Sequence, residues 1–182
     1  MIILIAGASH TGKTVLAQKL LEQYHYPYLS IDHLKMGLIR SGNTDLTVFD
    51  DDAMTEYLWP IVREMIKTAI ENGQNLIVEG CYIPFDWVAS FDDAYRAKIR
   101  SIRLIMSEDY IERHIDDILT HASDVEHRLD DSACTKQWLI EENRKELEGS
   151  SKFACPYILI EHNYDVAKAA VLLLEQEDAL CV

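Results

Sequence analysis

Residues 1–14 read MIILIAGASHTGKT, and the segment 7–14 fits the pattern G-x-x-x-x-G-K-[ST] at every constrained position. The apolar run at 2–5 just before it is typical of a central parallel strand that is buried on both faces. Apolar residues then recur at helical spacing and predict a helix that begins near Lys13. A strand, a glycine-bounded loop and a helix in this order favour a phosphate-binding loop over an ordinary glycine-containing turn.

The residue types in this loop suit a bound polyphosphate. Gly7 and Gly12 let the backbone curl so that successive N–H groups point at phosphate oxygens, and the helix N-terminus adds partial positive charge. Lys13 can reach the β- and γ-phosphates, and the Thr14 hydroxyl can bind Mg²⁺. The glycine spacing does not fit the dinucleotide-binding fingerprint. The residues predicted to bind a nucleoside triphosphate are therefore Gly7, Ala8, Ser9, His10, Thr11, Gly12, Lys13 and Thr14.

Length and composition indicate an ordinary globular protein. With 182 residues, we expect a single domain over residues 1–182. The formal net charge of −14 argues against a general nucleic-acid-binding surface, which needs a basic face. No segment has the length and pattern of a signal peptide or a membrane span, and the four cysteines lack metal-ligand spacing. We expect a cytoplasmic protein with reduced thiols that binds neither nucleic acid nor membrane.

Apolar runs and helical periodicity alternate along the rest of the chain. Runs typical of buried strands lie at residues 26–31, 76–78, 99–106 and 157–160. Segments with helical spacing lie at residues 34–39, 57–70, 108–119, 138–147 and 165–176. Pro60 is expected to kink its helix or to start a new one, and Gly149 is expected to end its helix. This alternation predicts an α/β fold, a five-stranded parallel sheet with helices on both faces.

Two carboxylates, Asp32 and Glu79, are predicted to lie at the carboxyl ends of strands, the edge where such sheets gather their ligands. Glu79 follows a buried apolar run, where it can hold Mg²⁺ directly or through water. Asp32 precedes a short helix, where it can accept a proton from an attacking hydroxyl. A helix cap for Asp32 and a solvated loop carboxylate for Glu79 remain the structural alternatives.

The loop and the segments 29–42 and 75–80 together resemble the small P-loop kinases of the nucleoside and nucleotide kinase superfamily, with a layout similar to adenylate kinase. The resemblance implies ATP and Mg²⁺ as cofactors, phosphoryl transfer to a small acceptor, and a small helical lid at about residues 121–134. Within this lid, Arg128-Leu129-Asp130-Asp131 looks like the arginine and paired aspartates of adenylate kinases. The resemblance thus implies that Arg128 closes over the transferred phosphate, with Arg113 and Arg144 on the flanking helices.

The chain also departs from adenylate kinases. Their Asp-Gly-[Phe/Tyr]-Pro-Arg run is replaced at residues 79–84 by Glu-Gly-Cys-Tyr-Ile-Pro, which has no arginine. The arginine of their acceptor helix is missing too, so Lys35 or Arg40 would have to replace it. Asp32 instead resembles the carboxylate that hydroxyl-phosphorylating kinases of this superfamily carry. These differences favour a hydroxyl acceptor over a nucleoside monophosphate.

The sequence therefore predicts an ATP-dependent small-molecule kinase with Lys13, Asp32 and Arg128 as catalytic residues and with Thr14 and Glu79 as metal ligands. A nucleoside monophosphate kinase is the first alternative. The second is a non-kinase ATP-binding regulator, although the chain lacks the guanine-reading Asn-Lys-x-Asp of switch GTPases. The expected partners are ATP and a small-molecule acceptor, and the sequence leaves a homodimer open.

Overall fold

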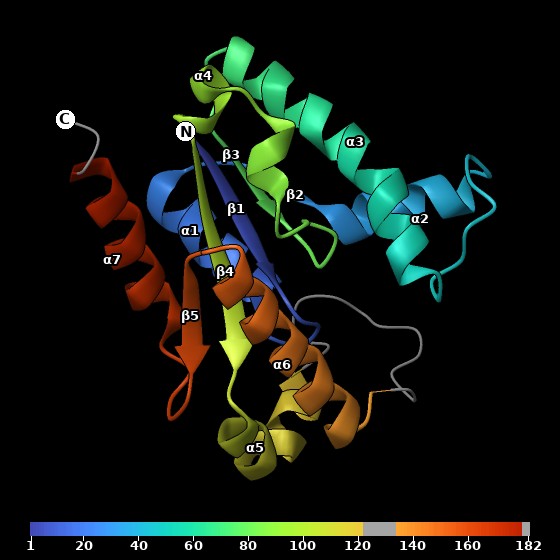
Figure 1. The fold of residues 1–182 in the computed structure, drawn as a ribbon, viewed down its shortest axis with the longest axis vertical. Coiled ribbons are helices and arrows are strands. Elements are labelled where there is room, and N and C mark those ends of the chain that lie inside the picture. Colours follow the sequence, from blue (N-terminus) through green and yellow to red (C-terminus); the bar gives the residue numbers. More distant parts are fainter. Residues whose placement is uncertain (122–133, 180–182) are drawn as a thin grey trace.

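The computed structural model describes residues 1–121 and 134–179, and within them five parallel strands form one sheet in the order β2-β3-β1-β4-β5 (Figure 1). The strands are β1 (Ile2–Gly7), β2 (Tyr28–Ser30), β3 (Leu76–Glu79), β4 (Ile99–Met106) and β5 (Tyr157–Ile160). The predicted fold class is confirmed. Because every strand runs in the same direction, their carboxyl ends meet at one edge of the sheet.

Helices cover both faces of this sheet, and in Figure 1 helix α6 lies in front of the strands and α1 behind them. The described helices are α1 (Lys13–Tyr24), α2 (Ile31–Arg40), α3 (Asp51–Glu71), the 3₁₀ helix η1 (Trp87–Ser90), α4 (Asp93–Arg96), α5 (Glu108–His121), α6 (Lys136–Lys152) and α7 (Val166–Ala179).

Strand β1 is central, and every one of its residues is buried. Its side chains alternate between two cores, as strand geometry requires. Ile2 and Leu4 pack in the core that contains α3. Ile3 and Ile5 pack in the core that contains α1 and α7. The continuous apolar run at the start of the sequence therefore reflects burial on both faces, and it fixes the position of the loop that follows.

One expectation about a helix end was wrong. Helix α6 does not end at Gly149 but continues to Lys152. A Cβ atom at Gly149 would lie 2.3 Å from the Phe85 ring, so this glycine permits close packing against an aromatic ring and is not a stop signal. Of the two alternatives for Pro60, the start of a new helix is excluded, because α3 is one helix that contains this residue.

The expected strand at 26–31 is shorter, and Asp32 is not at its end. β2 ends at Ser30, which occupies the N-cap position of α2, and Asp32 lies in the first turn of that helix. The alternative role of Asp32 as a helix cap is therefore wrong.

Most of the expected lid, residues 122–133 with Arg128, lies outside the described residues. Among the described residues, no helix combines the length and the apolarity that crossing a membrane requires.

Candidate active site

The loop between β1 and α1 has the tight backbone that the glycine pattern predicts. Gly7 and Gly12 both have positive φ, and a Cβ atom at Gly7 would lie only 2.2 Å from the Leu104 carbonyl oxygen of β4. Inside the loop, the Thr11 hydroxyl donates a hydrogen bond to the Ala8 carbonyl at 2.8 Å. The loop therefore folds against the sheet edge in a conformation that side chains at either glycine would disturb.

Lys13 is buried at the base of this loop, and its ammonium donates to the Ala8 carbonyl oxygen at 2.8 Å. Burial by itself lowers the pKa of this ammonium. Interactions of the ammonium with the Cys81 sulfur and with the carboxylates of Glu79 and Asp32 outweigh burial and raise the pKa above its usual value. Lys13 is thus a permanent cation at neutral pH, beside carboxylates from two neighbouring elements.

Glu79 and Thr14, the two predicted metal ligands, lie next to each other. The Thr14 hydroxyl is 3.4 Å from Glu79 Oε2 and donates to it. Glu79 ends β3, in register with Ile5 of β1 on one side and Ser30 of β2 on the other. Hydroxyl and carboxylate oxygens are the hard ligands that Mg²⁺ prefers, so this pair fits a magnesium ion bound beside the phosphate loop.

Asp32 is brought to the same edge by a close approach of two backbone segments. A Cβ atom at Gly80, directly after Glu79, would lie 2.9 Å from the Ile31 Cβ atom, so the start of α2 packs tightly on the end of β3. Asp32 Oδ1 forms an ion pair with Lys35 Nζ at 2.6 Å, and a third of the Asp32 side chain stays exposed. This carboxylate is therefore accessible from solvent.

Lys35 also contacts residues that the sequence did not single out. Its ammonium donates to the Tyr82 hydroxyl at 2.8 Å, and that hydroxyl donates to Asp51 Oδ1 at 3.0 Å. Burial, followed by the charges of Asp32 and Asp51, raises the pKa of Tyr82, which keeps its phenol protonated. The chain of contacts links the starts of α2 and α3. Its members are far apart in sequence and follow no motif, so no local pattern could have revealed it.

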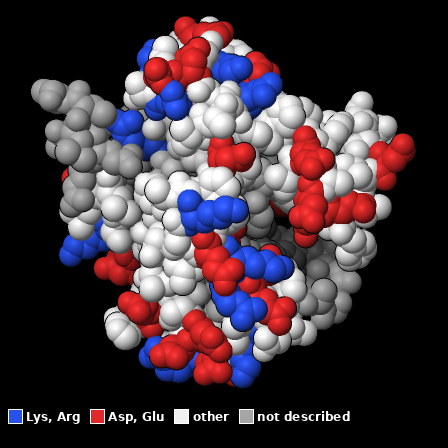
Figure 2. Space-filling view, viewed as in Figure 1, with Lys and Arg blue, Asp and Glu red and all other residues white. Residues whose placement is uncertain are grey.

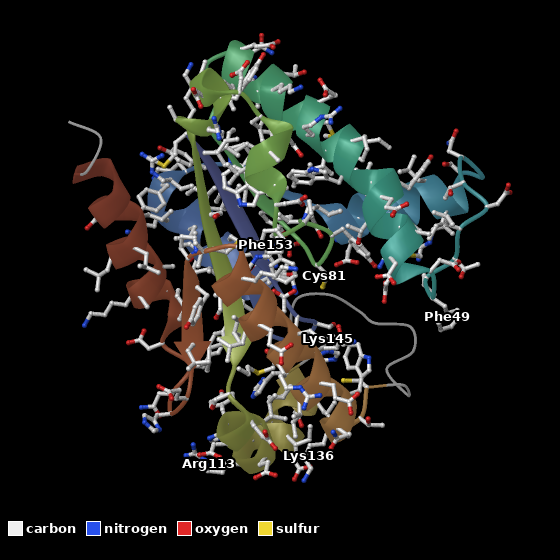
Figure 3. All side chains as sticks on the ribbon, in the orientation of Figure 1. Phe49, Cys81, Arg113, Lys136, Lys145 and Phe153 are labelled. Carbon is white, nitrogen blue, oxygen red and sulfur yellow. The ribbon has the colours of Figure 1, made fainter. Side chains whose placement is uncertain are left out.

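Cys81, labelled in Figure 3, directly follows Gly80, the residue after the end of β3. It belongs to the candidate site, because the Lys13 ammonium, which can only donate, interacts with the Cys81 sulfur. Its side chain is accessible from solvent, yet the protein around it desolvates the sulfur and raises its pKa. Cys81 is therefore a neutral thiol at neutral pH.

Arg113 is engaged away from the phosphate loop. It donates to the Asp109 carbonyl of its own helix and to the Glu161 carbonyl after β5, both at 2.9 Å. Figure 3 shows it on α5, and Arg144 is exposed on α6.

His10, inside the phosphate loop, contacts the Cys134 sulfur at 3.7 Å. The phosphate loop thus contacts the segment just before α6.

Acidic side chains gather on the right of Figure 2, over the start of α3 and the loop before it. Asp51, Asp52 and Glu56 are exposed there. The start of α3 is therefore rich in negative charge, and the charge of Lys35 on α2 is compensated by Asp32.

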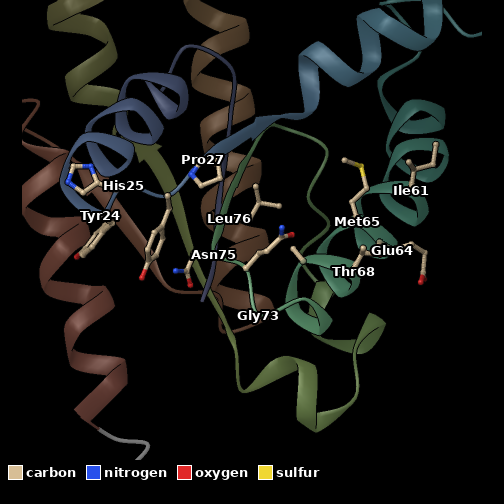
Figure 4. A pocket seen from close by; sticks show the side chains of 13 residues that line it. Tyr24, His25, Pro27, Ile61, Glu64, Met65, Thr68, Gly73, Asn75 and Leu76 are labelled. Carbon is tan, nitrogen blue, oxygen red and sulfur yellow. The ribbon is translucent and has the colours of Figure 1, made fainter.

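A separate cavity of about 980 Å³ lies at the other end of the sheet (Figure 4). It is lined by the end of α1 with Tyr24, by Pro27 before β2, by Met65 and Thr68 of α3, and by Leu76 at the start of β3. The lining residues lie before or at the amino ends of β2 and β3, whereas the phosphate loop follows the carboxyl end of β1. The cavity is therefore not part of the candidate active site.

Comparisons with known proteins agree with this architecture. No protein-family model and no curated protein sequence matches the chain. Solved structures do match over nearly the whole length. A sugar kinase from Janibacter sp. HTCC2649 is 14% identical with a TM-score of 0.60, covering 96% of this chain and 94% of its own. Shikimate kinase from Aquifex aeolicus VF5 is 17% identical with a TM-score of 0.54, covering 99% of each chain.

Deoxyadenosine kinase from M. mycoides is 16% identical with a TM-score of 0.55, covering 98% of this chain and 100% of its own. The chain therefore has the fold of the small P-loop kinases. These three neighbours act on different acceptors, so the fold alone does not define the acceptor of this protein.

Proposed function

We propose that this protein is an ATP-dependent phosphotransferase that transfers the γ-phosphate to a hydroxyl group of a small-molecule acceptor. The observation that supports this most is the meeting of three functional groups at one sheet edge. The Lys13 ammonium, the Thr14–Glu79 oxygen pair and the Asp32 carboxylate come from three different elements. A phosphate cradle, a metal site and an accessible base are the parts that phosphoryl transfer to a hydroxyl requires.

Residues 7–14 would hold the phosphates of ATP through backbone N–H groups and Lys13. Thr14 and Glu79 would hold Mg²⁺, directly or through water. The metal neutralises charge on the phosphates when it is bound. The resemblance adds Arg128 as the guanidinium that would stabilise the charge on the transferred group.

Asp32 would accept the proton of the acceptor hydroxyl as that oxygen attacks the γ-phosphorus. Two features support this role. A third of its side chain is exposed beside Lys13, and its ion pair with Lys35 orients one oxygen. The proton goes to Asp32, the new bond joins the acceptor oxygen to phosphorus, and ADP leaves.

The contacts of Lys35 favour a hydroxyl over a phosphate as the acceptor group. A nucleoside monophosphate would need a cation to bind its phosphate, and the sequence offered Lys35 or Arg40 for it. Lys35 is only 12% exposed and already bonds Asp32 and Tyr82. Binding an acceptor phosphate there would break the ion pair that orients Asp32.

An ADP-release assay over a panel of acceptors tests this proposal. The panel contains neutral sugars and polyols, amino sugars, nucleosides, nucleoside monophosphates and shikimate-like hydroxy acids, with Mg·ATP throughout. We expect turnover with at least one hydroxyl compound, and we expect Asp32→Asn to abolish it. Turnover only with nucleoside monophosphates would favour the adenylate kinase-like alternative. ATP binding with no turnover beyond slow hydrolysis would favour a regulator.

A further inference from the structure

We propose that Tyr164, in the loop after β5, is a positioning residue that orients two peptide units of the phosphate loop toward the bound phosphates. This inference rests on the proposed function, because it assumes that residues 7–14 bind a nucleotide. It adds a residue outside the motif, more than 150 positions along the chain, to the machinery that holds the phosphates.

The contact is direct and involves two consecutive carbonyl groups. The Tyr164 hydroxyl is 3.2 Å from the Thr11 carbonyl oxygen and 3.0 Å from that of Gly12, and it donates its single proton between them. The approach is close enough that a Cβ atom at Gly12 would lie 1.9 Å from the Tyr164 hydroxyl oxygen. Gly12 is therefore needed both for its left-handed backbone, with φ of 78°, and for the space that Tyr164 fills.

The geometry of the peptide unit links these carbonyls to the phosphates. In a trans peptide, the C=O of one residue and the N–H of the next lie in one plane and point in opposite directions. The Thr11 carbonyl therefore opposes the Gly12 N–H, and the Gly12 carbonyl opposes the Lys13 N–H. A donor that holds both carbonyls on the outside of the loop fixes both N–H groups toward its inside.

The second acceptor site of the Gly12 carbonyl is also filled. The Leu16 N–H donates to it at 3.0 Å in the first turn of α1. This oxygen thus accepts one hydrogen bond from the Leu16 N–H and one from the Tyr164 hydroxyl. The peptide between Gly12 and Lys13 is therefore held by two donors.

Tyr164 is itself anchored. Its loop is held at the other end by Arg113, which donates to the Glu161 carbonyl at 2.9 Å. Burial raises the pKa of the Tyr164 phenol, so the hydroxyl remains a proton donor at neutral pH. The loop after β5 therefore holds the phosphate loop in place through the hydrogen bond that the Tyr164 hydroxyl donates.

The test measures binding of the phosphate chain separately from binding of the base. Isothermal titration calorimetry of the full chain with Mg·ATP, and with Mg·tripolyphosphate alone or as a competitor of Mg·ATP, compares wild type with Tyr164→Phe. Tyr157→Phe, an exposed tyrosine on β5, is the matched control. The loss of one hydrogen bond is expected to weaken both ligands by the same factor, roughly three- to tenfold. The control should leave both affinities unchanged.

An unchanged affinity of Tyr164→Phe for either ligand would overturn the inference. A loss for ATP with none for tripolyphosphate would mean that Tyr164 contacts the base instead. Melting temperatures of the ligand-free variants separate a folding defect from a binding defect, and affinities are calculated on the folded fraction. If the wild-type protein binds no nucleotide, the proposed function fails, which is a different result from equal binding by wild type and Tyr164→Phe.

Discussion

The Thr14 hydroxyl and the Glu79 carboxylate, 65 positions apart in sequence, lie 3.4 Å from each other at the carboxyl edge of the sheet. Thr14 lies at the start of α1, which follows β1, and Glu79 is the last residue of the neighbouring parallel strand β3. Hydroxyl and carboxylate oxygens are the hard ligands that Mg²⁺ prefers, and this proximity is the reason why we propose that the two residues bind one cation.

Glu79→Gln is expected to weaken magnesium binding, because an amide oxygen carries no charge to offset the cation. We expect the Mg²⁺ concentration for half-maximal ATP binding to rise by roughly 10- to 100-fold, the usual effect of losing a group at a metal site. Calorimetric titration of ATP at a series of Mg²⁺ concentrations measures this. Glu148→Gln, which changes an exposed residue of α6, is the control. A Mg²⁺ dependence that is identical in both variants would contradict the metal assignment.

Lys13→Ala is expected to abolish binding of Mg·ATP while the protein stays folded. The alanine removes the only side-chain cation that the motif supplies, whereas the backbone of the loop is held by Thr11 and the glycines. Calorimetry and the melting temperature should be measured on the same sample. Retained ATP affinity would contradict the role of Lys13.

The pKa of Lys13 gives this site a defined pH dependence. The pKa is raised in the folded protein above its ordinary value of 10.5. The stability that comes from the charged form is therefore fully present below pH 10.5 and is lost as the pH rises through the folded value. Between pH 6 and 9, ATP affinity should not fall through deprotonation of Lys13, and calorimetry across that range checks this.

Asp32→Asn should lower kcat far more than it lowers ATP affinity, since Asp32 is proposed to act on the acceptor proton. General-base catalysis typically contributes about 10²- to 10⁴-fold, and a loss of that size is expected in the ADP-release assay. Asp116→Asn, exposed on α5, should change neither quantity. Equal losses of kcat and ATP affinity would indicate that Asp32 serves the phosphate loop instead.

A feature of this molecule could be predicted from the sequence when it depends on residues that are close together along the chain. Four of the strands, the glycine-bounded turn between β1 and α1 and the position of Glu79 at the end of β3 follow from local patterns and agree with the structure, whereas the strand expected at 26–31 is shorter. Gly149 was misread because its role depends on Phe85, which packs against it from another part of the chain. A local pattern predicts a helix or a strand, but it does not predict which other part of the chain packs against it.

The same limit applies to the candidate site. The motif residues were found from spacing alone, whereas Tyr82, Asp51 and Tyr164 were not. Each of these contacts the site through one hydroxyl or carboxylate, and none lies in a recurring pattern. Their roles arise from the packing of α2, α3 and the loop after β5, which the sequence does not display.

Arg103 is a further residue that no pattern revealed, because it interrupts an apolar strand. It lies in β4 and is 2% exposed, and its guanidinium donates to Glu146 on α6 at 2.8 Å and to the Ile83 carbonyl at 2.6 Å. It also lies over the Phe85 ring, 3.9 Å from the ring centre. One buried cation thus ties α6 and the segment after Glu79 to the sheet.

Glu146→Ala should therefore destabilise the protein strongly, because it leaves the Arg103 charge buried without its carboxylate. Breaking a buried pair in this way typically costs about 3–5 kcal/mol, more than a surface ion pair contributes. Urea denaturation followed by circular dichroism measures the change in the free energy of unfolding. Glu148→Ala, on the exposed side of the same helix, should change that free energy little. A similar small change in both variants would mean that water reaches Arg103 and screens its charge, which its 2% exposure argues against.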